Sequence, residues 1–157
     1  MGAKVRFTIV VDVHLFLIKD RKILLLLREN TGYEDGKYHL PAGHMDEDEP
    51  VTTTLIRESK EEIGIGIEKG DIKLVHIMHS IDGKERVGFF FEVKKWNGKI
   101  KNMEPEKHGE VKWFDIDKLP KNMVAYAKYA IERYKNGQLL SEYGWDKNRA
   151  YNSLLDV

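Results

Sequence analysis

The strongest constraint on this chain is a charged segment bounded by two glycines, Gly43 and Gly64. Three glutamates, Glu58, Glu61 and Glu62, fall within five consecutive positions of it. At about 100° per residue these side chains occupy an arc of roughly 100° on a helix, so like charges crowd one face and repel each other. A hard divalent cation relieves that repulsion, and Mg²⁺ commonly pairs one or two carboxylates with substrate phosphates. The sequence therefore predicts a helix that carries a metal site.

The limits of this helix are visible in the sequence. Proline is favoured at the first helical position, so we expect the helix to start near Pro50, and glycine commonly follows the last turn, so it ends at Gly64. The apolar residues between them share one face at helical spacing: Val51, Leu55, Ile56 and Ile63. Ser59 projects into that face, where it lets the helix approach a sheet closely or bonds to its own preceding turn.

The segment from Gly43 to Ile65 resembles the box of the Nudix family, whose fixed positions are G-x5-E-x7-R-E-U-x-E-E-x-G-U, with U aliphatic. All seven fixed identities are present: Gly43, Glu49, Arg57, Glu58, Glu61, Glu62 and Gly64. If each matched by chance at roughly 7%, the joint chance would be about 10⁻⁸ per position. Ser59 is a departure, because the family usually has an aliphatic residue there. A solvated, salt-bridged helix face is the alternative, but it needs neither glycine.

The resemblance implies a metal site and a division of roles. The implied ligands of Mg²⁺, or of Mn²⁺ as a substitute, are the Gly43 backbone carbonyl and the side chains of Glu58, Glu61 and Glu62. Glu58 is the first candidate for the general base, and Glu62 is expected to be the most buried of the three glutamates. The implied catalytic residues are Glu58, Arg57 and Glu61, with Arg57 orienting Glu61 through a paired hydrogen bond. Glu49 is expected to cap or charge the start of the helix.

Composition excludes several classes of protein. Lys plus Arg and Asp plus Glu both number 26 in 157 residues, and this neutral balance argues against dedicated nucleic-acid binding. Without cysteine the chain has neither disulfides nor a thiolate nucleophile, which fits the cytoplasm. No apolar run approaches the ~20 residues that span a bilayer. We expect one domain over residues 1–157, with a core at about 5–136 and a loosely packed tail at 138–157.

Strand and helix patterns alternate along the chain. Strands are expected at Arg6–Lys19, Ile23–Leu27, Tyr38–Leu40, Ile72–His79, Val87–Val93 and Val111–Phe114, with a second helix from Met123 to Tyr134 that stops at Gly137. This order predicts an α+β fold with a mixed sheet between helices. The Nudix resemblance implies the same α/β/α sandwich.

The resemblance implies hydrolysis of a nucleoside diphosphate linked to another group. Lys101 to Lys107 and Leu40 to His44 are similar to segments of MutT-like enzymes, so the leading expectation is cleavage of a (deoxy)nucleoside triphosphate, including an oxidised one, to monophosphate and pyrophosphate. The alternatives are a pyrophosphatase for nucleotide sugars, dinucleotides or RNA 5′ ends, and a sensor that binds a nucleotide without cleaving it. ADP-ribose hydrolases tend to have a proline about fifteen residues beyond the box, and none lies there.

Substrate recognition needs aromatic and polar groups outside the box. The candidates are Tyr38, His44, Phe89 and Glu104. Because residues 89–91 are consecutive phenylalanines in a strand, at least one is core. The alternative for His44 is a purely structural role. Glu104 or Glu106 could instead add a metal ligand or a general base. A homodimer that packs through the segment from Gln138 is the remaining expectation about partners.

Overall fold

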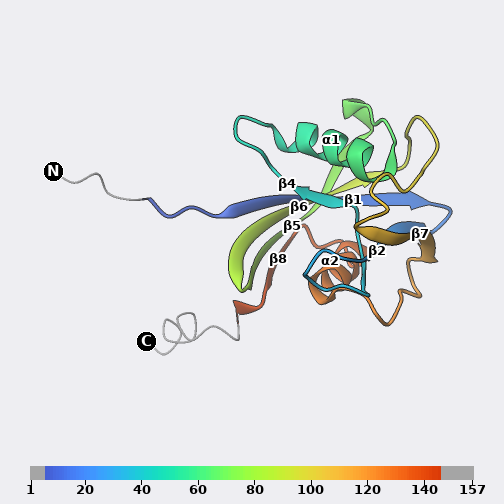
Figure 1. Cartoon of the computed structure of the whole chain (residues 1–157). Helices are drawn as coiled ribbons and strands as arrows, with labels where there is room; N and C mark the ends of the chain where they lie inside the picture. The colour runs from blue at the N-terminus through green and yellow to red at the C-terminus, as the bar shows by residue number, and fades with distance from the viewer. Residues whose placement is uncertain (1–5, 146–157) are drawn as a thin grey trace.

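The fold is a mixed β-sheet with one helix on each face. The computed structural model describes residues 6–145. Helix α1 (Val51–Ile63) covers one face of the sheet and α2 (Ala125–Lys135) the other (Figure 1). The predicted α+β sandwich is therefore confirmed. Within residues 6–145, no helix is both long enough and apolar enough to cross a membrane.

Strand β1 (Val10–Lys19) is the centre of the sheet. On one side it pairs in parallel with β6 (Lys84–Val93), followed by antiparallel β5 (Lys73–Asp82) and parallel β8 (Leu140–Tyr143). On its other side the start of β1 pairs with β4 (Ala42–His44), and its end pairs with β2 (Lys22–Arg28). Strand β2 in turn pairs with β3 (Tyr38–His39) and β7 (His108–Asp115). The sheet therefore opens between β4 and β2, near the start of the charged segment.

Alternation along β1 divides the core in two. Successive side chains of a strand point to opposite faces, so Val13, Leu15 and Leu17 pack in the cluster that contains Leu55 of α1. Phe16 packs in the other cluster, with the residues of α2. Each helix therefore has its own apolar contact with the sheet.

Helix α1 begins and ends close to the predicted limits. Pro50 is the residue just before the helix, with φ −64° and ψ 143°, so the first helical residue is Val51. Gly64 follows the last turn with φ 73°, a left-handed conformation that costs glycine little. The hydroxyl of Ser59 is buried and donates to the Leu55 carbonyl at 2.7 Å. This bond to the preceding turn explains how a polar residue occupies the apolar face.

The strands differ from expectation in three places. Strand β1 starts at Val10 and not at Arg6, and β4 was not predicted. Residues 140–143, which we expected in a loose tail, form β8 and pair with β5. The remaining expected strands and the second helix are present with shifted ends. The rest of the expected tail, residues 146–157, and with it much of the proposed dimer contact, lies outside the described residues.

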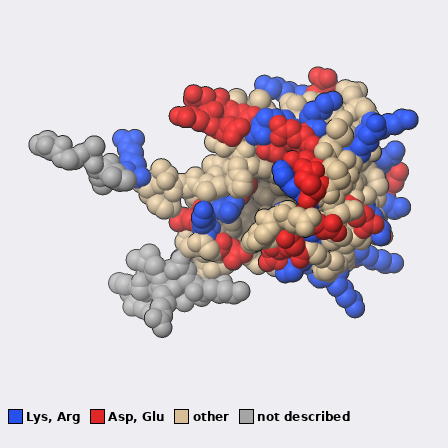
Figure 2. Space-filling view, viewed as in Figure 1, with Lys and Arg blue, Asp and Glu red and all other residues tan. Residues whose placement is uncertain are grey.

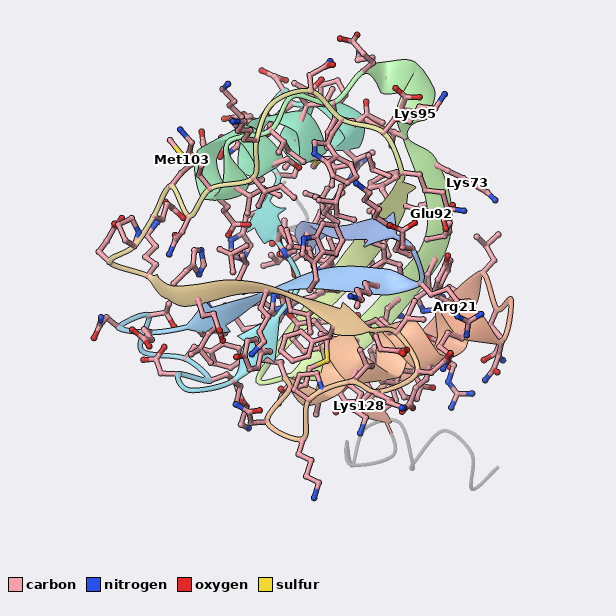
Figure 3. The ribbon with its side chains drawn as sticks, turned by 90° about the vertical axis from the view of Figure 1, so that its right-hand side faces the viewer. Arg21, Lys73, Glu92, Lys95, Met103 and Lys128 are labelled. Atoms are coloured by element: carbon pink, nitrogen blue, oxygen red, sulfur yellow. The ribbon has the colours of Figure 1, made fainter. Side chains whose placement is uncertain are left out.

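The segment between β6 and β7 runs along α1, with Met103 beside the helix (Figure 3). Its backbone bonds to the end of α1: Met103 N–H donates to the Glu62 carbonyl at 3.0 Å, and Lys101 N–H donates to the Ile63 carbonyl at 3.0 Å. These donors satisfy carbonyls that the end of a helix leaves free. The bonds also fix the start of β7 close to the glutamates of α1.

Candidate active site

Arg57 is the hub of the charged segment. Its guanidinium donates two bonds to Glu49, Nε to Oε1 at 2.9 Å and Nη2 to Oε2 at 3.0 Å. It also donates to Glu58 Oε1 at 2.7 Å, to Glu61 Oε2 at 3.3 Å and to the His44 carbonyl at 3.1 Å. The paired bond that we expected at Glu61 is therefore made to Glu49. Glu49 makes no cap to the helix and instead anchors Arg57.

The three box glutamates differ in exposure. The side chain of Glu62 is 11% exposed, that of Glu58 17% and that of Glu61 53%. Burial raises the pKa of Glu58 to about 6, although Arg57 opposes this shift. Burial also raises the pKa of Glu62. The expectation that Glu62 is the most buried of the three is confirmed, and both buried carboxylates lack full compensation of their charge.

Gly43 lies directly against Glu58. A Cβ on Gly43 would lie 1.9 Å from Cδ of Glu58 and 2.1 Å from its Oε1, so no other residue type fits beside that carboxylate as it is placed. Glu62 is held to the same strand, because its Oε2 accepts the Ala42 N–H at 2.9 Å. A backbone strand and two under-compensated carboxylates thus lie side by side, and this oxygen-rich set fits a divalent cation such as Mg²⁺.

A second group lies at the other oxygen of Glu62. His108 Nε2 is 3.4 Å from Glu62 Oε1 and 3.6 Å from Glu104 Oε2. One ligand atom from each of these three residues lies within 4.8 Å of the others. The structure therefore brings Glu104, which we predicted near the site, to the box glutamates. Sequence reasoning missed His108, although it directly follows the segment 101–107 that was singled out.

A cavity of about 310 Å³ opens on the α2 side of the sheet and reaches Gly43 and His44. Figure 2 shows a hollow with acidic side chains above it, over α1. Asp12 in the cavity is buried and accepts from Arg86 Nη1 at 3.1 Å, and His44 Nε2 lies 3.2 Å from its other oxygen. The negative charge of Asp12 offsets the positive charge of Arg86. Arg86 and His44 therefore offer polar contacts to a ligand without a strong net charge.

An aromatic wall forms the inner part of the cavity. His14 stacks on Phe90 with ring centres 4.3 Å apart and planes 11° apart, and both line the cavity with Tyr126. His14 Nδ1 is buried and has no hydrogen-bond partner among residues 6–145. Burial lowers the pKa of His14 well below its usual value, so the ring is neutral at pH 7. An apolar, aromatic inner end is typical of pockets that bind small molecules.

His39 supports this wall. Its Nδ1 is 2.6 Å from the Leu40 carbonyl and its Nε2 is 2.6 Å from the Tyr126 hydroxyl. Because a carbonyl only accepts, Nδ1 carries the proton, and Nε2 accepts from Tyr126. Burial lowers the pKa of His39 to about 4.

This lowered pKa predicts a loss of stability in acid. Below pH 6.5 the unfolded chain binds a proton at His39 that the folded chain does not bind until about pH 4. The free energy of unfolding should therefore fall over this window, by on the order of 3 kcal/mol from His39. Urea unfolding at pH 7.0 and 4.0 measures this fall, and His39→Gln should show a smaller one. Equal falls in both proteins would contradict the assignment.

Three of the four predicted substrate residues do not line the cavity: Glu104 lies beside Glu62 instead, and Tyr38 and Phe89 are packed elsewhere. Tyr38 is buried against Phe114, with ring centres 4.7 Å apart, and its hydroxyl donates to Glu110. Phe89 packs in the α1-side cluster, whereas its neighbour Phe90 lines the cavity. His44 does line it, with its side chain 66% exposed. The prediction that one of the three phenylalanines is core is confirmed by Phe90, which is fully buried.

Asp12, His14 and Arg86 were not predicted as site residues. The signal was present in the sequence, because two polar residues at alternate positions interrupt an otherwise apolar strand. Such residues share one face of the strand. Only the placement of α2 shows that this face borders a cavity.

Comparison with known proteins gives a consistent result. The model of the NUDIX domain matches residues 8–134. A curated protein of Methanocaldococcus jannaschii, described as an ADP-ribose pyrophosphatase, is 33% identical over 124 residues, which cover 76% of this chain and 70% of that protein.

Solved structures agree on the fold. A MutT NUDIX hydrolase from Burkholderia pseudomallei aligns with a TM-score of 0.73 at 29% identity, over 80% of this chain and 98% of the other. A MutT protein from Methanosarcina mazei aligns with a TM-score of 0.71 at 24% identity, over 85% of this chain and 97% of the other. The second similarity concerns the fold alone.

Proposed function

The chain belongs to the Nudix domain family, and from this membership we propose that it is a Mg²⁺-dependent pyrophosphatase that cleaves a nucleoside triphosphate to a monophosphate and pyrophosphate. The broader activity follows from the family: the protein is a hydrolase of phosphoric anhydrides in nucleoside diphosphate derivatives. The proposal concerns the substrate, the metal and the residues that act.

One observation carries the proposal: the carboxylates of α1 and the cavity on the opposite face of the sheet meet at the short strand β4. Gly43 contacts Glu58 on one side and lines the cavity on the other. A nucleotide whose base enters the cavity would have its phosphates directed past Gly43 and His44 towards the glutamates. This arrangement lets one ligand reach both the cavity and the carboxylate cluster.

In this proposal the residues near the carboxylate cluster have separate roles in holding the metal, acting as base and positioning the glutamates. Bound Mg²⁺ supplies positive charge for the phosphate oxygens and lowers the pKa of water. We assign Glu58, Glu61, Glu62 and the Gly43 carbonyl to holding it. Glu58 has a pKa of about 6, close to the neutral range in which a general base works best. Arg57 positions Glu58 and Glu61.

The cavity supports a nucleoside at the other end. The stacked rings of His14 and Phe90 are buried and close the inner end of the cavity, so a base would lie in front of them, beside accessible lining side chains such as Tyr33 and His44. Arg86 and His44 at the mouth lie where the first phosphate would pass. These contacts favour a nucleotide over an inorganic polyphosphate.

A second substrate class has its own support. The relative from M. jannaschii carries the name of an ADP-ribose pyrophosphatase, whereas the B. pseudomallei structure carries the name MutT. The prolines of this chain are at positions 41, 50, 105 and 120, so the proline typical of ADP-ribose hydrolases is missing. We therefore rank the triphosphate first and ADP-ribose second.

A substrate panel tests the proposal. The metal-free protein is incubated with Mg²⁺ and ATP, GTP, dGTP, an oxidised dGTP, ADP-ribose, a nucleotide sugar and a dinucleotide, and the products are separated by ion-exchange chromatography. We expect pyrophosphate and monophosphate from triphosphates at the highest kcat/KM. Faster release of AMP and ribose phosphate from ADP-ribose would replace the first candidate by the second. Tight binding without turnover of any compound would make the protein a sensor.

A further inference from the structure

The imidazole of His108 is buried next to two carboxylates without making a hydrogen bond. Its side chain is 6% exposed, and neither Nδ1 nor Nε2 has a hydrogen-bond partner among residues 6–145. Nε2 points between Glu62 Oε1 and Glu104 Oε2, at 3.4 Å and 3.6 Å. An unpaired polar group in the interior costs about 1–3 kcal/mol, so this position calls for a partner.

The two carboxylates present one oxygen each to His108 and use the other elsewhere. Glu62 Oε2 accepts the Ala42 N–H, and Glu104 Oε1 accepts from Lys107 Nζ at 2.7 Å. The oxygens Glu62 Oε1 and Glu104 Oε2 are therefore the ones directed at the imidazole. A three-atom set of one nitrogen and two oxygens converges on one small volume.

The backbone holds this set in place. The backbone N–H of His108 donates to the Glu104 carbonyl at 3.0 Å. The side chain of Asn102 joins the same two residues, because it accepts from the Glu104 N–H at 3.2 Å and donates to the His108 carbonyl at 2.5 Å. Because the segment is also bonded to the end of α1, Glu104 and His108 are fixed relative to Glu62. Ligands that are held before binding lose less freedom when an ion arrives.

We propose that Glu62, Glu104 and His108 form a divalent-cation site that prefers a transition metal such as Zn²⁺ to Mg²⁺. The site adjoins the oxygen-only group of Gly43, Glu58 and Glu61 and shares Glu62 with it. It extends the metal part of the proposed function, and it requires only that the chain binds cations, whichever nucleotide is cleaved.

The nitrogen donor is the reason for this selectivity. Mg²⁺ is bound through oxygen and water, whereas imidazole suits zinc and other first-row transition ions. Histidine and glutamate are both zinc ligands, and catalytic zinc sites likewise use three protein ligands and leave a fourth position open. The box glutamates alone would not discriminate in this way.

Metal binding tests the site directly. Metal-free protein is titrated with Zn²⁺, Mn²⁺ and Mg²⁺ by calorimetry. We expect the wild-type protein to bind Zn²⁺ at least a hundredfold more tightly than Mg²⁺. His108→Gln should weaken Zn²⁺ binding by about 100-fold or more, because losing a direct ligand costs at least as much as losing one of the outer partners that orient it, and it should change Mg²⁺ binding less than threefold. His79→Gln is the matched control, because His79 also lies next to a glutamate, Glu85, at 2.8 Å, and it should bind as the wild type does.

A spectroscopic measurement on the wild-type protein makes the test independent of any variant. Pulsed electron paramagnetic resonance of the protein with one equivalent of Cu²⁺, a paramagnetic ion that imidazole suits, should show coupling to an imidazole nitrogen, which His79→Gln keeps and His108→Gln loses. Absence of this coupling in the wild type, or unchanged Zn²⁺ affinity in His108→Gln, would overturn the proposal. Nucleotide turnover with Mg²⁺ is measured separately, so the site and the proposed function can fail independently.

Discussion

Glu62→Gln is expected to lower kcat/KM with Mg²⁺ by about 10³-fold while the protein stays folded, in line with the loss of a preorganised electrostatic group. Glutamine has nearly the same shape, and its carbonyl oxygen can still accept the Ala42 N–H that now bonds to Glu62 Oε2. The substitution therefore removes a negative charge and a cation ligand without opening a cavity. Burial raises the pKa of Glu62 because a buried charge is unfavourable. Glutamine carries no charge, so this cost disappears and the free energy of unfolding should be equal or higher.

Steady-state kinetics on the best substrate of the panel and thermal unfolding measure the two halves of this prediction. Glu68→Gln is the control, since Glu68 is exposed and lies beyond the end of α1, and it should behave as the wild type. A Glu62→Gln protein with unchanged kcat/KM would remove Glu62 from the metal site. A protein that fails to unfold cooperatively would mean that Glu62 is structural.

Gly43→Ala is expected to lower kcat/KM by about 10²-fold with a small effect on stability. The added Cβ would lie 1.9 Å from Cδ of Glu58, so the Glu58 side chain must move off the strand. Its displacement of an ångström or more separates the proposed base from its working position, and misplacement on that scale can cost about 10²-fold in rate. Backbone strain is not the cause, because φ of Gly43 is not in the left-handed region.

Gly70→Ala is the matched control for this substitution. A Cβ there would meet nothing within 4 Å, so activity and melting temperature should stay at wild-type values. Kinetics and thermal unfolding on both variants separate a displaced carboxylate from a general effect of losing a glycine. Wild-type kcat/KM in Gly43→Ala would show that the contact with Glu58 does not matter for turnover.

The sequence was sufficient for α1 because its signals are local. The helix limits near Pro50 and Gly64, the apolar face and the burial of Glu62 all follow from spacing within one helix. Glu49 does not make the expected cap, for the same reason, although it does lie two residues before the start of the helix. Its position before the helix suggested a cap, but Arg57, eight residues later, reaches it with two bonds, and a charge-assisted pair is stronger than a bond to a helix end.

The remainder of the site depends on contacts between distant segments. His108 lies next to Glu62 because the backbone at Lys101 and Met103 bonds to the end of α1. No periodic pattern in the sequence predicts these bonds. Phe90, and not Phe89, lines the cavity because the register of β6 against β1 sets which side faces α2. Alternation shows that two faces exist, but only the assembled sheet shows which one borders a ligand.

The two faces of β1 have a consequence for changing this protein. Residues of the cavity wall, such as His14 and Phe90, pack on the α2 side, whereas the apolar contacts that hold α1 lie on the other side. Ligand preference and cation binding therefore depend on largely separate sets of side chains, which join only at β4. This separation allows the cavity residues to be substituted, in a laboratory library or in evolution, while the carboxylate cluster of α1 is kept unchanged.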